Sequence, residues 1–253
     1  MNCIFCNNNI EKESIEHIVP ESLGNERYIL KPNCLCGDCN NSFSKFEAEA
    51  ISKTILGFER ARLGIKTKKG KPSIGEVQDI KFTAHDELKK NYITAHGIKS
   101  EHIVGTNEKD RTFQVKVPAF DNNAMATSKL ILKIGFESIY QSKKCFIKEF
   151  DFNELKNYLL KKDNKDWPFI TSRVPIHTFK SIPSFFEKYS LKRIECYLNY
   201  LHLDSKTILF QFKYGGAHFV LNLLNRNTDW AKEYFAKDKN ARLYPEYLMK
   251  KQN

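Results

Sequence analysis

Cys3-Ile4-Phe5-Cys6 and Cys36-Gly37-Asp38-Cys39 are the two stretches that decide how the N-terminal part of this chain folds. In each stretch two residues separate the cysteines, a spacing that lets both thiolates bind one cation. Two such pairs supply the four ligands of a tetrahedral structural Zn²⁺ site. The segment between the pairs is longer than the commonest zinc-ribbon spacing. We therefore expect this segment to form structure of its own.

The chain has seven cysteines, and three of them fall outside the two pairs: Cys34, Cys145 and Cys196. Cys34 lies two residues before Cys36 and competes with it as a ligand. We favour Cys36 because it restores the two-residue gap to Cys39, and we expect Cys34 to be a buried thiol. The sequence shows no basic start followed by an apolar run, and no apolar run long enough to span a bilayer. A soluble, cytoplasmic protein with free or metal-bound thiols is the expectation.

Composition allows a sizeable core and indicates an anionic partner. The chain has 253 residues, of which 41% are hydrophobic, so it can form one large domain or two small ones. Its formal net charge is +11, with lysine and arginine spread along its whole length. This charge describes either a solvated basic surface or a protein that binds a polyanion, most often nucleic acid. Charge alone does not separate DNA from RNA.

The residues around the cysteine pairs predict two short strands followed by a helix. Residues 14–19 have the β-branched bias of a strand that Pro20 ends, and residues 28–30 form a second short strand. Asp38 or Asn40 caps a helix whose apolar residues share one face, and helical character continues to about Leu63. We therefore expect a small zinc-bound ββα finger over residues 1–63.

Residues 64–75 form a predicted basic linker, because they combine three glycines and a proline with Lys66, Lys68, Lys69 and Lys71. This linker is either a solvated loop or a strap against a phosphate backbone. Beyond it we expect a larger mixed α+β domain over residues 76–253, which gives the whole chain an α+β fold. The expected strands are 77–84, 91–96, 112–117, 194–203, 207–214 and 218–224. The expected helices are 124–142, with Lys129 and Lys133 facing outward, 153–162 and 229–236.

Glu16, His17 and Asn40 carry the chemistry that we expect of the finger. A neutral imidazole is the natural general base near neutral pH, so His17 could take a proton from water attacking a phosphodiester. Mg²⁺ or Mn²⁺ would stabilise the developing negative charge, and its protein ligands would be the oxygens of Glu16 and Asn40. Because Asn40 adjoins Cys39, the zinc site would hold it in place.

Residues 3–46 resemble the HNH endonucleases, specifically their zinc-stapled subgroup. The matching pieces are Cys3-x-x-Cys6, Glu16-His17-Ile18-Val19-Pro20-Glu21-Ser22-Leu23-Gly24, Asn33 and Cys36-x-x-Cys39-Asn40. The resemblance implies a ββα-metal finger that cleaves nucleic acid, nearly always DNA. It implies His17 as the general base, Glu16 and Asn40 as ligands of the catalytic ion, and Asn33 as the residue that orders the loop. Asn25 stands where many members have a second glycine, a place where asparagine tolerates left-handed backbone.

Other interpretations stay open. A structural zinc finger that binds nucleic acid without cutting it would need neither Glu16-His17 nor Asn40. An RNA-directed nuclease is a third interpretation, and free-standing HNH proteins often belong to restriction or anti-phage systems, an analogy only. Residues 76–253 would then recognise the substrate, a protein partner or a second copy of the chain. Aromatic residues at helical spacing read as core rather than as base-stacking surfaces: Phe185, Phe186 and Tyr189. The remaining six histidines are scattered and read as surface or core residues: His85, His96, His102, His177, His202 and His218.

Overall fold

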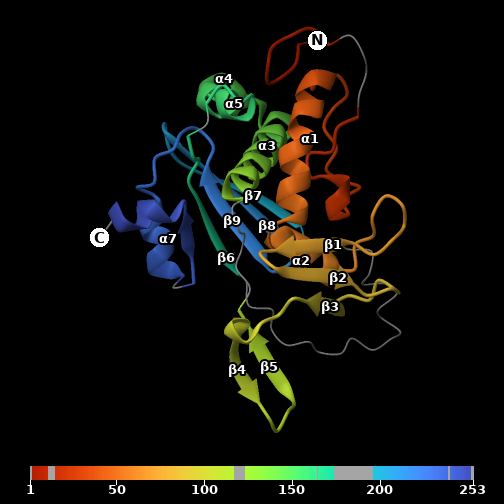
Figure 1. Ribbon diagram of the computed structural model, residues 1–253. Coiled ribbons are helices and arrows are strands. Elements are labelled where there is room, and N and C mark those ends of the chain that lie inside the picture. The colour runs from red at the N-terminus through yellow and green to blue at the C-terminus, as the bar shows by residue number, and fades with distance from the viewer. Residues whose placement is uncertain are drawn as a thin grey trace.

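The computed structural model describes residues 2–10, 15–116, 123–163, 165–173, 196–238 and 240–251. The part that holds the cysteine pairs leads into two helices, and antiparallel sheets with further helices follow it. In Figure 1 the long helix α3 (Ala124–Ser142) crosses in front of the large sheet, with α1 (Gly37–Ser52) beside it. The fold is mixed α+β, as the sequence predicts.

Between the cysteine pairs, two chain segments meet at one isolated antiparallel bridge, His17 with Ile29. Two backbone hydrogen bonds of 2.8 Å flank it: Ile18 N–H to Tyr28 O, and Leu30 N–H to Glu16 O. The prediction of full strands at 14–19 and 28–30 is therefore wrong for the described residues, although the pairing itself is present. Pro20 leads directly into the short 3-10 helix η1 (Glu21–Leu23), and this turn leaves no length for a ladder. Ser14 lies outside the described residues.

The predicted single helix after the second cysteine pair is two helices, α1 and α2 (Ile55–Arg62). The break falls at Thr54, which is fully buried and has an extended backbone. Its hydroxyl oxygen accepts from the Leu56 N–H at 3.2 Å and donates to the carbonyl of Ala50. Threonine is a preferred N-cap, so this hydroxyl ends one helix and starts the next.

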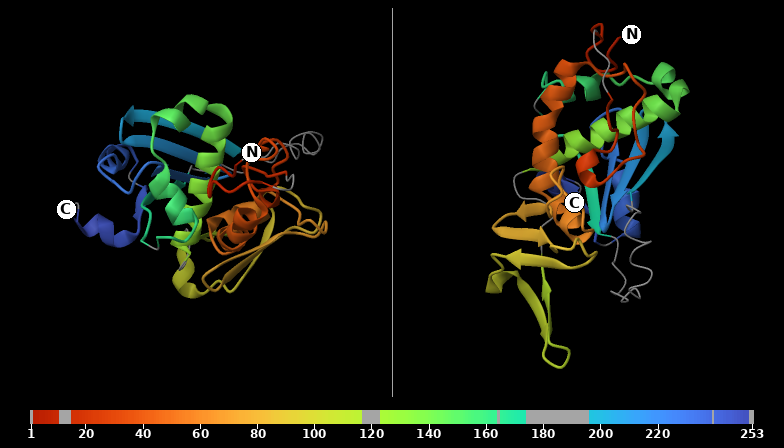
Figure 2. Two further views of the ribbon diagram at one scale, coloured as in Figure 1. Left: turned by 90° about the horizontal axis from the view of Figure 1, so that it is seen from above. Right: turned by 90° about the vertical axis from the view of Figure 1, so that its right-hand side faces the viewer.

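The segment after α2 forms a three-stranded antiparallel sheet of β1 (Ile74–Val77), β2 (Ile80–Ala84) and β3 (Ile93–His96). The strand predicted at 77–84 is therefore wrong, because a two-residue turn at Gln78, whose φ is 52°, divides it into a hairpin. After η2 (Ser100–His102), β4 (Ile103–Asn107) and β5 (Thr112–Val115) pair as a separate hairpin. This hairpin projects from the body in Figures 1 and 2. Val117 of the predicted strand 112–117 lies outside the described residues.

The large sheet has five described strands in the order β10-β6-β9-β8-β7, all neighbours antiparallel. Their bounds are β6 (Phe169–Arg173), β7 (Cys196–Asp204), β8 (Thr207–Tyr214), β9 (Ala217–Asn222) and β10 (Arg242–Tyr244). The prediction of 207–214 is confirmed with its bounds, and those of 194–203 and 218–224 are confirmed with shifted ends. The strands β6 and β10 were not predicted. Four residues singled out in the sequence lie outside the described residues: His177, Phe185, Phe186 and Tyr189.

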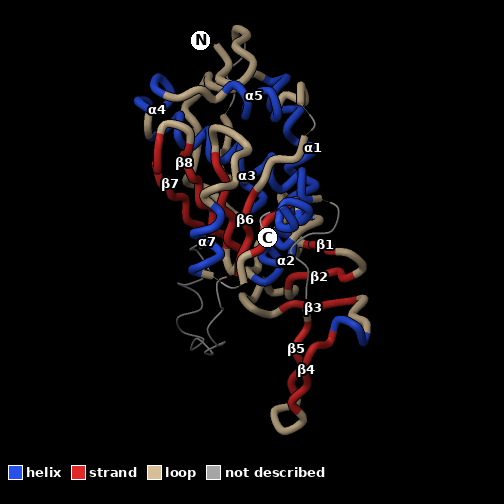
Figure 3. Tube along the Cα trace, turned by 90° about the vertical axis from the view of Figure 1, so that its left-hand side faces the viewer, coloured by secondary structure: helices blue, strands red, loops and turns tan. Residues whose placement is uncertain are grey.

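Helices cover both faces of this sheet. On one face α3 packs so closely that a Cβ on Gly135 would come within 2.8 Å of the Phe210 ring. On the other face α7 (Ala231–Lys237) packs with Trp230 against Leu209 and Val220, and Figure 3 shows this helix beside the strands. The remaining helices are α4 (Lys144–Glu149), α5 (Asn153–Leu159) and η3 (Glu246–Lys251). The helix prediction 124–142 is confirmed, 153–162 and 229–236 are confirmed with shifted bounds, and α4 was missed.

The finger shares its core with the rest of the chain. Phe5 packs on Phe43 of α1 at 4.9 Å between ring centroids and on Phe136 of α3 at 5.1 Å. The same cluster of buried apolar residues continues to Phe212 in the large sheet. The core therefore has no break at residues 64–75, and the division into separate domains stays a prediction. Among the described residues, no helix is long and apolar enough to cross a membrane.

A buried carboxylate joins α2 to the turn between β8 and β9. Glu59 is fully buried, and its Oε2 accepts from Arg62 Nε at 2.8 Å, Arg62 Nη2 at 2.6 Å and the Gly216 N–H at 2.9 Å. Arg62 also donates to the Asn91 side chain at 2.6 Å. This network fixes α2 between the two sheets.

Replacing Glu59 should therefore destabilise the whole chain. Glu59→Gln leaves the Arg62 guanidinium buried without its counter-charge, and we expect a loss of about 3 kcal/mol in the free energy of unfolding. Urea unfolding monitored by circular dichroism measures it. Glu108→Gln, at the exposed tip of the β4–β5 hairpin, is the matched control and should stay within about 0.5 kcal/mol of wild type. Equal stability of the two variants would contradict this role.

Candidate nuclease site

The four paired cysteines come together. The Sγ atoms of Cys3, Cys6, Cys36 and Cys39 all lie within 4.8 Å of one another, and those of Cys6 and Cys36 are 3.6 Å apart. Sulfur ligands 2.3 Å from a tetrahedral zinc ion would be about 3.8 Å apart, so the cluster fits Zn²⁺. No disulfide joins these cysteines. The chemistry of the donor set and its closeness both match a structural zinc site, with all four positions taken by protein.

Local backbone geometry explains why the cluster forms. Cys36 is the N-cap of α1, and its sulfur accepts from the Cys39 N–H at 3.5 Å. The first pair lies in a tight turn in which the Cys3 N–H donates to Asn8 O at 2.8 Å, and Asn7 takes left-handed backbone with a φ of 62°. A hydrogen bond from Cys39 lowers the pKa of Cys3 to about 4, and the Cys3 thiolate raises the pKa of Cys39.

Cys34 stays out of the cluster, as predicted. It is buried, and its sulfur lies 3.8 Å from the carbonyl oxygen of Pro32. Burial raises the pKa of the Cys34 thiol, with the Tyr140 hydroxyl opposing part of that effect. Cys34 is thus a protonated core thiol rather than a ligand. Outside the cluster, Cys145 is exposed and Cys196 is half-buried.

His17 lies on the bridge that replaces the predicted strands. The ring is half-buried, and its Nδ1 atom is buried without a hydrogen-bond partner among the described residues. Buried polar atoms in native proteins nearly always have a partner. An unpartnered ring nitrogen is therefore consistent with a partner that comes from water, an ion or a substrate.

Asn40 lies in the first turns of α1, next to Cys39. Its N–H donates to the Cys36 carbonyl at 3.1 Å, and its side chain is half-buried. The cysteine cluster therefore fixes the backbone from which the Asn40 amide projects. The catalytic roles of His17, Asn40, Glu16 and Asn33 stay predictions.

The loop after His17 is organised by Asn25, a role that the sequence did not reveal. The Asn25 side-chain oxygen accepts from the N–H groups of Arg27 and Tyr28, each at 3.0 Å. Its amide nitrogen donates to the carbonyl of Val19 at 2.6 Å, so it joins both sides of the loop. Asn25 does not use the left-handed backbone that asparagine tolerates; the neighbouring Gly24 takes it, with a φ of 75°. Asn33 also has it, with a φ of 62°, in the turn before the second cysteine pair.

Glu16 makes a contact that joins the finger to α3. Its Oε1 lies 2.7 Å from the Nζ of Lys133, which is also 2.9 Å from Glu47 Oε1 and 3.3 Å from Glu137 Oε2. Lys133 and Glu137 are fully buried, and Lys129 is 6% exposed, so the expectation that both lysines face outward is wrong. The four-residue spacing of Lys133 and Glu137 is also typical of an exposed ion pair on a helix surface. This pair is buried instead because the finger packs over it.

Burial and neighbouring charges shift the pKa values of Glu137 and Lys133. Burial raises the pKa of Glu137 to about 8, although the Lys133 ammonium opposes the shift. Burial alone would lower the pKa of Lys133, but the three carboxylates around it raise it above its usual value. Lys133 therefore stays charged, and it supplies the counter-charge that keeps Glu16 in place.

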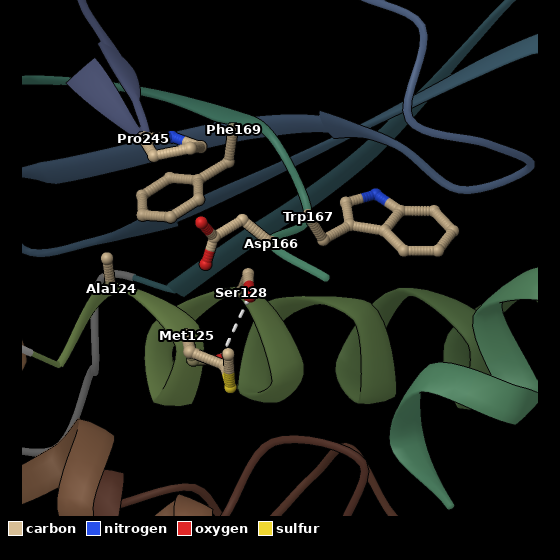
Figure 4. A pocket seen from close by; sticks show the side chains of 7 residues that line it. All are labelled: Ala124, Met125, Ser128, Asp166, Trp167, Phe169 and Pro245. Atoms are coloured by element: carbon tan, nitrogen blue, oxygen red, sulfur yellow. Dashed lines mark hydrogen bonds between the residues drawn. The ribbon is translucent and has the colours of Figure 1, made fainter. Parts of the chain in front are cut away.

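A small cavity elsewhere is not a candidate site. It lies between the start of α3 and the segment around Trp167, and Figure 4 shows its lining residues. Its volume is about 10 Å³, room for no more than a single water molecule. Nothing in its lining comes from the cysteine cluster or the bridge at His17.

Lys133 and Lys129 give a matched test of the buried cluster. Lys133→Met leaves three clustered carboxyl groups without their cation, and we expect the free energy of unfolding to fall by about 3–5 kcal/mol. Lys129 lies one turn earlier on α3 over the Tyr158 ring, so Lys129→Met should cost far less. Urea unfolding at neutral pH compares the two variants. A Lys133→Met variant as stable as Lys129→Met would refute the assignment.

Cys36 and Cys34 give a matched test of the metal site. Cys36→Ser removes a ligand and should lower zinc content well below one ion per chain, with a large drop in melting temperature, because small fingers depend on their metal. Cys34→Ser should keep one zinc ion. Elemental analysis and thermal unfolding measure both. Zinc content unchanged in Cys36→Ser would show that the ligand set is misassigned.

Comparison with known proteins agrees with this geometry. A family model described as HNH endonuclease matches residues 3–56, which contain the cysteine cluster, the bridge at His17, the whole of α1 and the first two residues of α2. Searches of curated proteins and of solved structures found no match. Residues 3–56 of this chain are an HNH endonuclease domain.

Proposed function

We propose that this protein is a metal-dependent endonuclease that hydrolyses phosphodiester bonds of DNA. The observation that carries the proposal is the imidazole of His17. It lies within the HNH match, on the bridge beside Glu16, and has a buried ring nitrogen without a partner among the described residues. The net charge of +11 supports a polyanionic substrate.

In this proposal each residue has a defined task. His17 accepts the proton of the attacking water as general base. Glu16 and Asn40 offer the oxygen ligands that Mg²⁺ or Mn²⁺ prefers, and such an ion supplies charge stabilisation at the phosphate when bound. Lys133 contacts Glu16 Oε1, and Oε2 would be the metal ligand in this proposal. The saturated cysteine cluster takes no part in the reaction and holds Asn40 in place.

DNA is favoured over RNA by the resemblance to HNH endonucleases, and RNA is the alternative substrate. A role in restriction or anti-phage defence in the cytoplasm belongs to the same proposal and rests on analogy with free-standing HNH proteins. Infection of cells carrying wild type or His17→Ala with phage tests it. Equal phage yield in both would contradict the defence role and leave the enzymatic proposal to the cleavage assay.

His17→Ala should abolish cleavage without unfolding the protein. Loss of a general base typically costs about 10²–10⁴-fold in rate. Plasmid, single-stranded DNA and structured RNA are incubated with pure zinc-loaded protein and Mg²⁺ or Mn²⁺, and products are resolved on gels. His96→Ala is the control, since His96 is exposed on β3 and distant in sequence from the domain.

Three outcomes separate the alternatives. Cleavage of plasmid by wild type and His96→Ala, but not by a folded, zinc-loaded His17→Ala, supports the proposal. Cleavage of RNA but not of DNA would show that RNA is the substrate. Retention of DNA without product under every divalent ion would favour a non-catalytic zinc-finger module.

A further inference from the structure

An open cavity of about 500 Å³ lies between α2 and the basic loop that follows it. Its lining residues are Arg60, Thr67, Lys68, Lys69, Lys71, Pro72 and Ile74. Four of these seven residues are cationic, and none is acidic. A concave surface with one sign of charge concentrates anions.

The loop that carries the lysines has a defined shape. Lys66 and Pro72 form an antiparallel bridge, and the Thr67 N–H donates to Lys71 O at 2.8 Å. Gly70 closes the turn with a φ of 76° and donates its N–H to Thr67 O at 2.9 Å. The turn therefore presents its lysines from a hydrogen-bonded frame rather than from a loose strap.

The frame is held against α2. A Cβ on Gly75 would come within 2.3 Å of the Gly57 carbonyl carbon, so the two backbones are in direct contact. This contact leaves no room for a side chain at either position. It places the lysine turn beside the helix that carries Arg60.

Arg60 is a buried cation with no ion-pair partner in the part of the chain that the structure describes. It is 7% exposed, and its Nε is buried with no hydrogen-bond partner among the described residues. Burial lowers its pKa. Arg62, two residues later, is also buried but pairs with Glu59 at 2.6 Å. The helix α2 thus pairs the guanidinium of Arg62 within the protein, but not that of Arg60. Because an unpaired buried charge is costly, we infer that Arg60 takes a partner from outside the chain.

The cavity borders the nuclease motif. Lys68 Nζ lies 3.3 Å from Oε2 of Glu21, the residue that follows Pro20 in the motif loop. Both side chains are about half exposed or more, so this surface pair contributes little stability. A phosphate could therefore replace the Glu21 carboxylate as the partner of Lys68.

We propose that this cavity is a phosphate-binding subsite for the nucleic-acid strand, next to the HNH site, with Arg60 and the three lysines as its ligands. The inference rests on the proposed function and adds a named contact to it. Arg60 supplies a planar fork suited to two phosphate oxygens, and Lys68, Lys69 and Lys71 supply point charges. The subsite reads the backbone and not the base, so it gives affinity and strand placement without sequence preference.

Binding is tested apart from cleavage. A fluorescently labelled DNA duplex is titrated with the full chain carrying His17→Ala, so that no product forms, over a range of NaCl concentrations. Adding Lys68→Gln, Lys69→Gln and Lys71→Gln should raise the Kd at least tenfold near 0.1 M salt. Each lost phosphate contact lowers the slope of log K against log salt by about 0.9, so we expect the slope to flatten by about two to three.

The matched control removes the same charge elsewhere. Lys206→Gln, Lys232→Gln and Lys237→Gln are exposed and lie at the β7–β8 turn and on α7. This triple variant should change the Kd less than threefold. Arg60→Lys keeps the charge but loses the fork, and it should weaken binding while circular dichroism shows a folded protein.

The outcomes distinguish this inference from the proposed function. Selective loss of duplex affinity in the cavity variants supports the subsite, whether or not the wild-type protein cleaves DNA. Absence of cleavage by the wild-type protein would contradict only the nuclease proposal. Equal loss in both triple variants would show a general charge effect and overturn the subsite. Competition by inorganic phosphate that the cavity variants abolish, with duplex affinity unchanged, would assign the cavity to a small phosphate ligand and also overturn it.

Discussion

The contact between the ammonium group of Lys133 and three surrounding carboxyl groups is the interaction on which the arrangement of this protein depends. Its partners come from three places: Glu16 from the nuclease motif, Glu47 from α1, and Glu137 from α3 itself. A buried charge is tolerated only when it is paired. The charges of this cluster are all paired only when the motif, α1 and α3 pack together. Removing one partner of a buried ion pair is strongly destabilising, and here the partners include Glu16, the residue beside His17.

The cysteine cluster stabilises the same arrangement of the motif, α1 and α3 at a second position. It holds the first turn of the chain against the N-terminus of α1, and the Phe5 ring beside it packs on both Phe43 and Phe136. A finger of about fifty residues has too little apolar surface for a stable core of its own. The finger therefore packs against α3, so residues outside the HNH match help to stabilise this domain.

Two arginines on the helix α2 have opposite roles. Arg62 completes a buried network with Glu59 that reaches the β8–β9 turn, and so it serves the fold. Arg60 has no such partner among the described residues and lines a basic cavity beside the motif loop. Placing both on one short helix couples the position of the cavity to the position of the sheets.

The sequence by itself determined the cysteine ligand set, the nuclease motif, the long helix at 124–142 and the strand at 207–214, because spacing and periodicity are local properties. Only the tertiary structure decided that Lys133 is buried, that Asn25 organises the motif loop, and that part of the segment 64–75 lines a cavity. The burial of Lys133 depends on residues far apart in the chain, since Lys133 and Glu16 are separated by 117 positions. An outward lysine and a buried one look identical in a helical pattern until the element that covers them is known. Burial is a property of the packed chain, and a local pattern does not contain it.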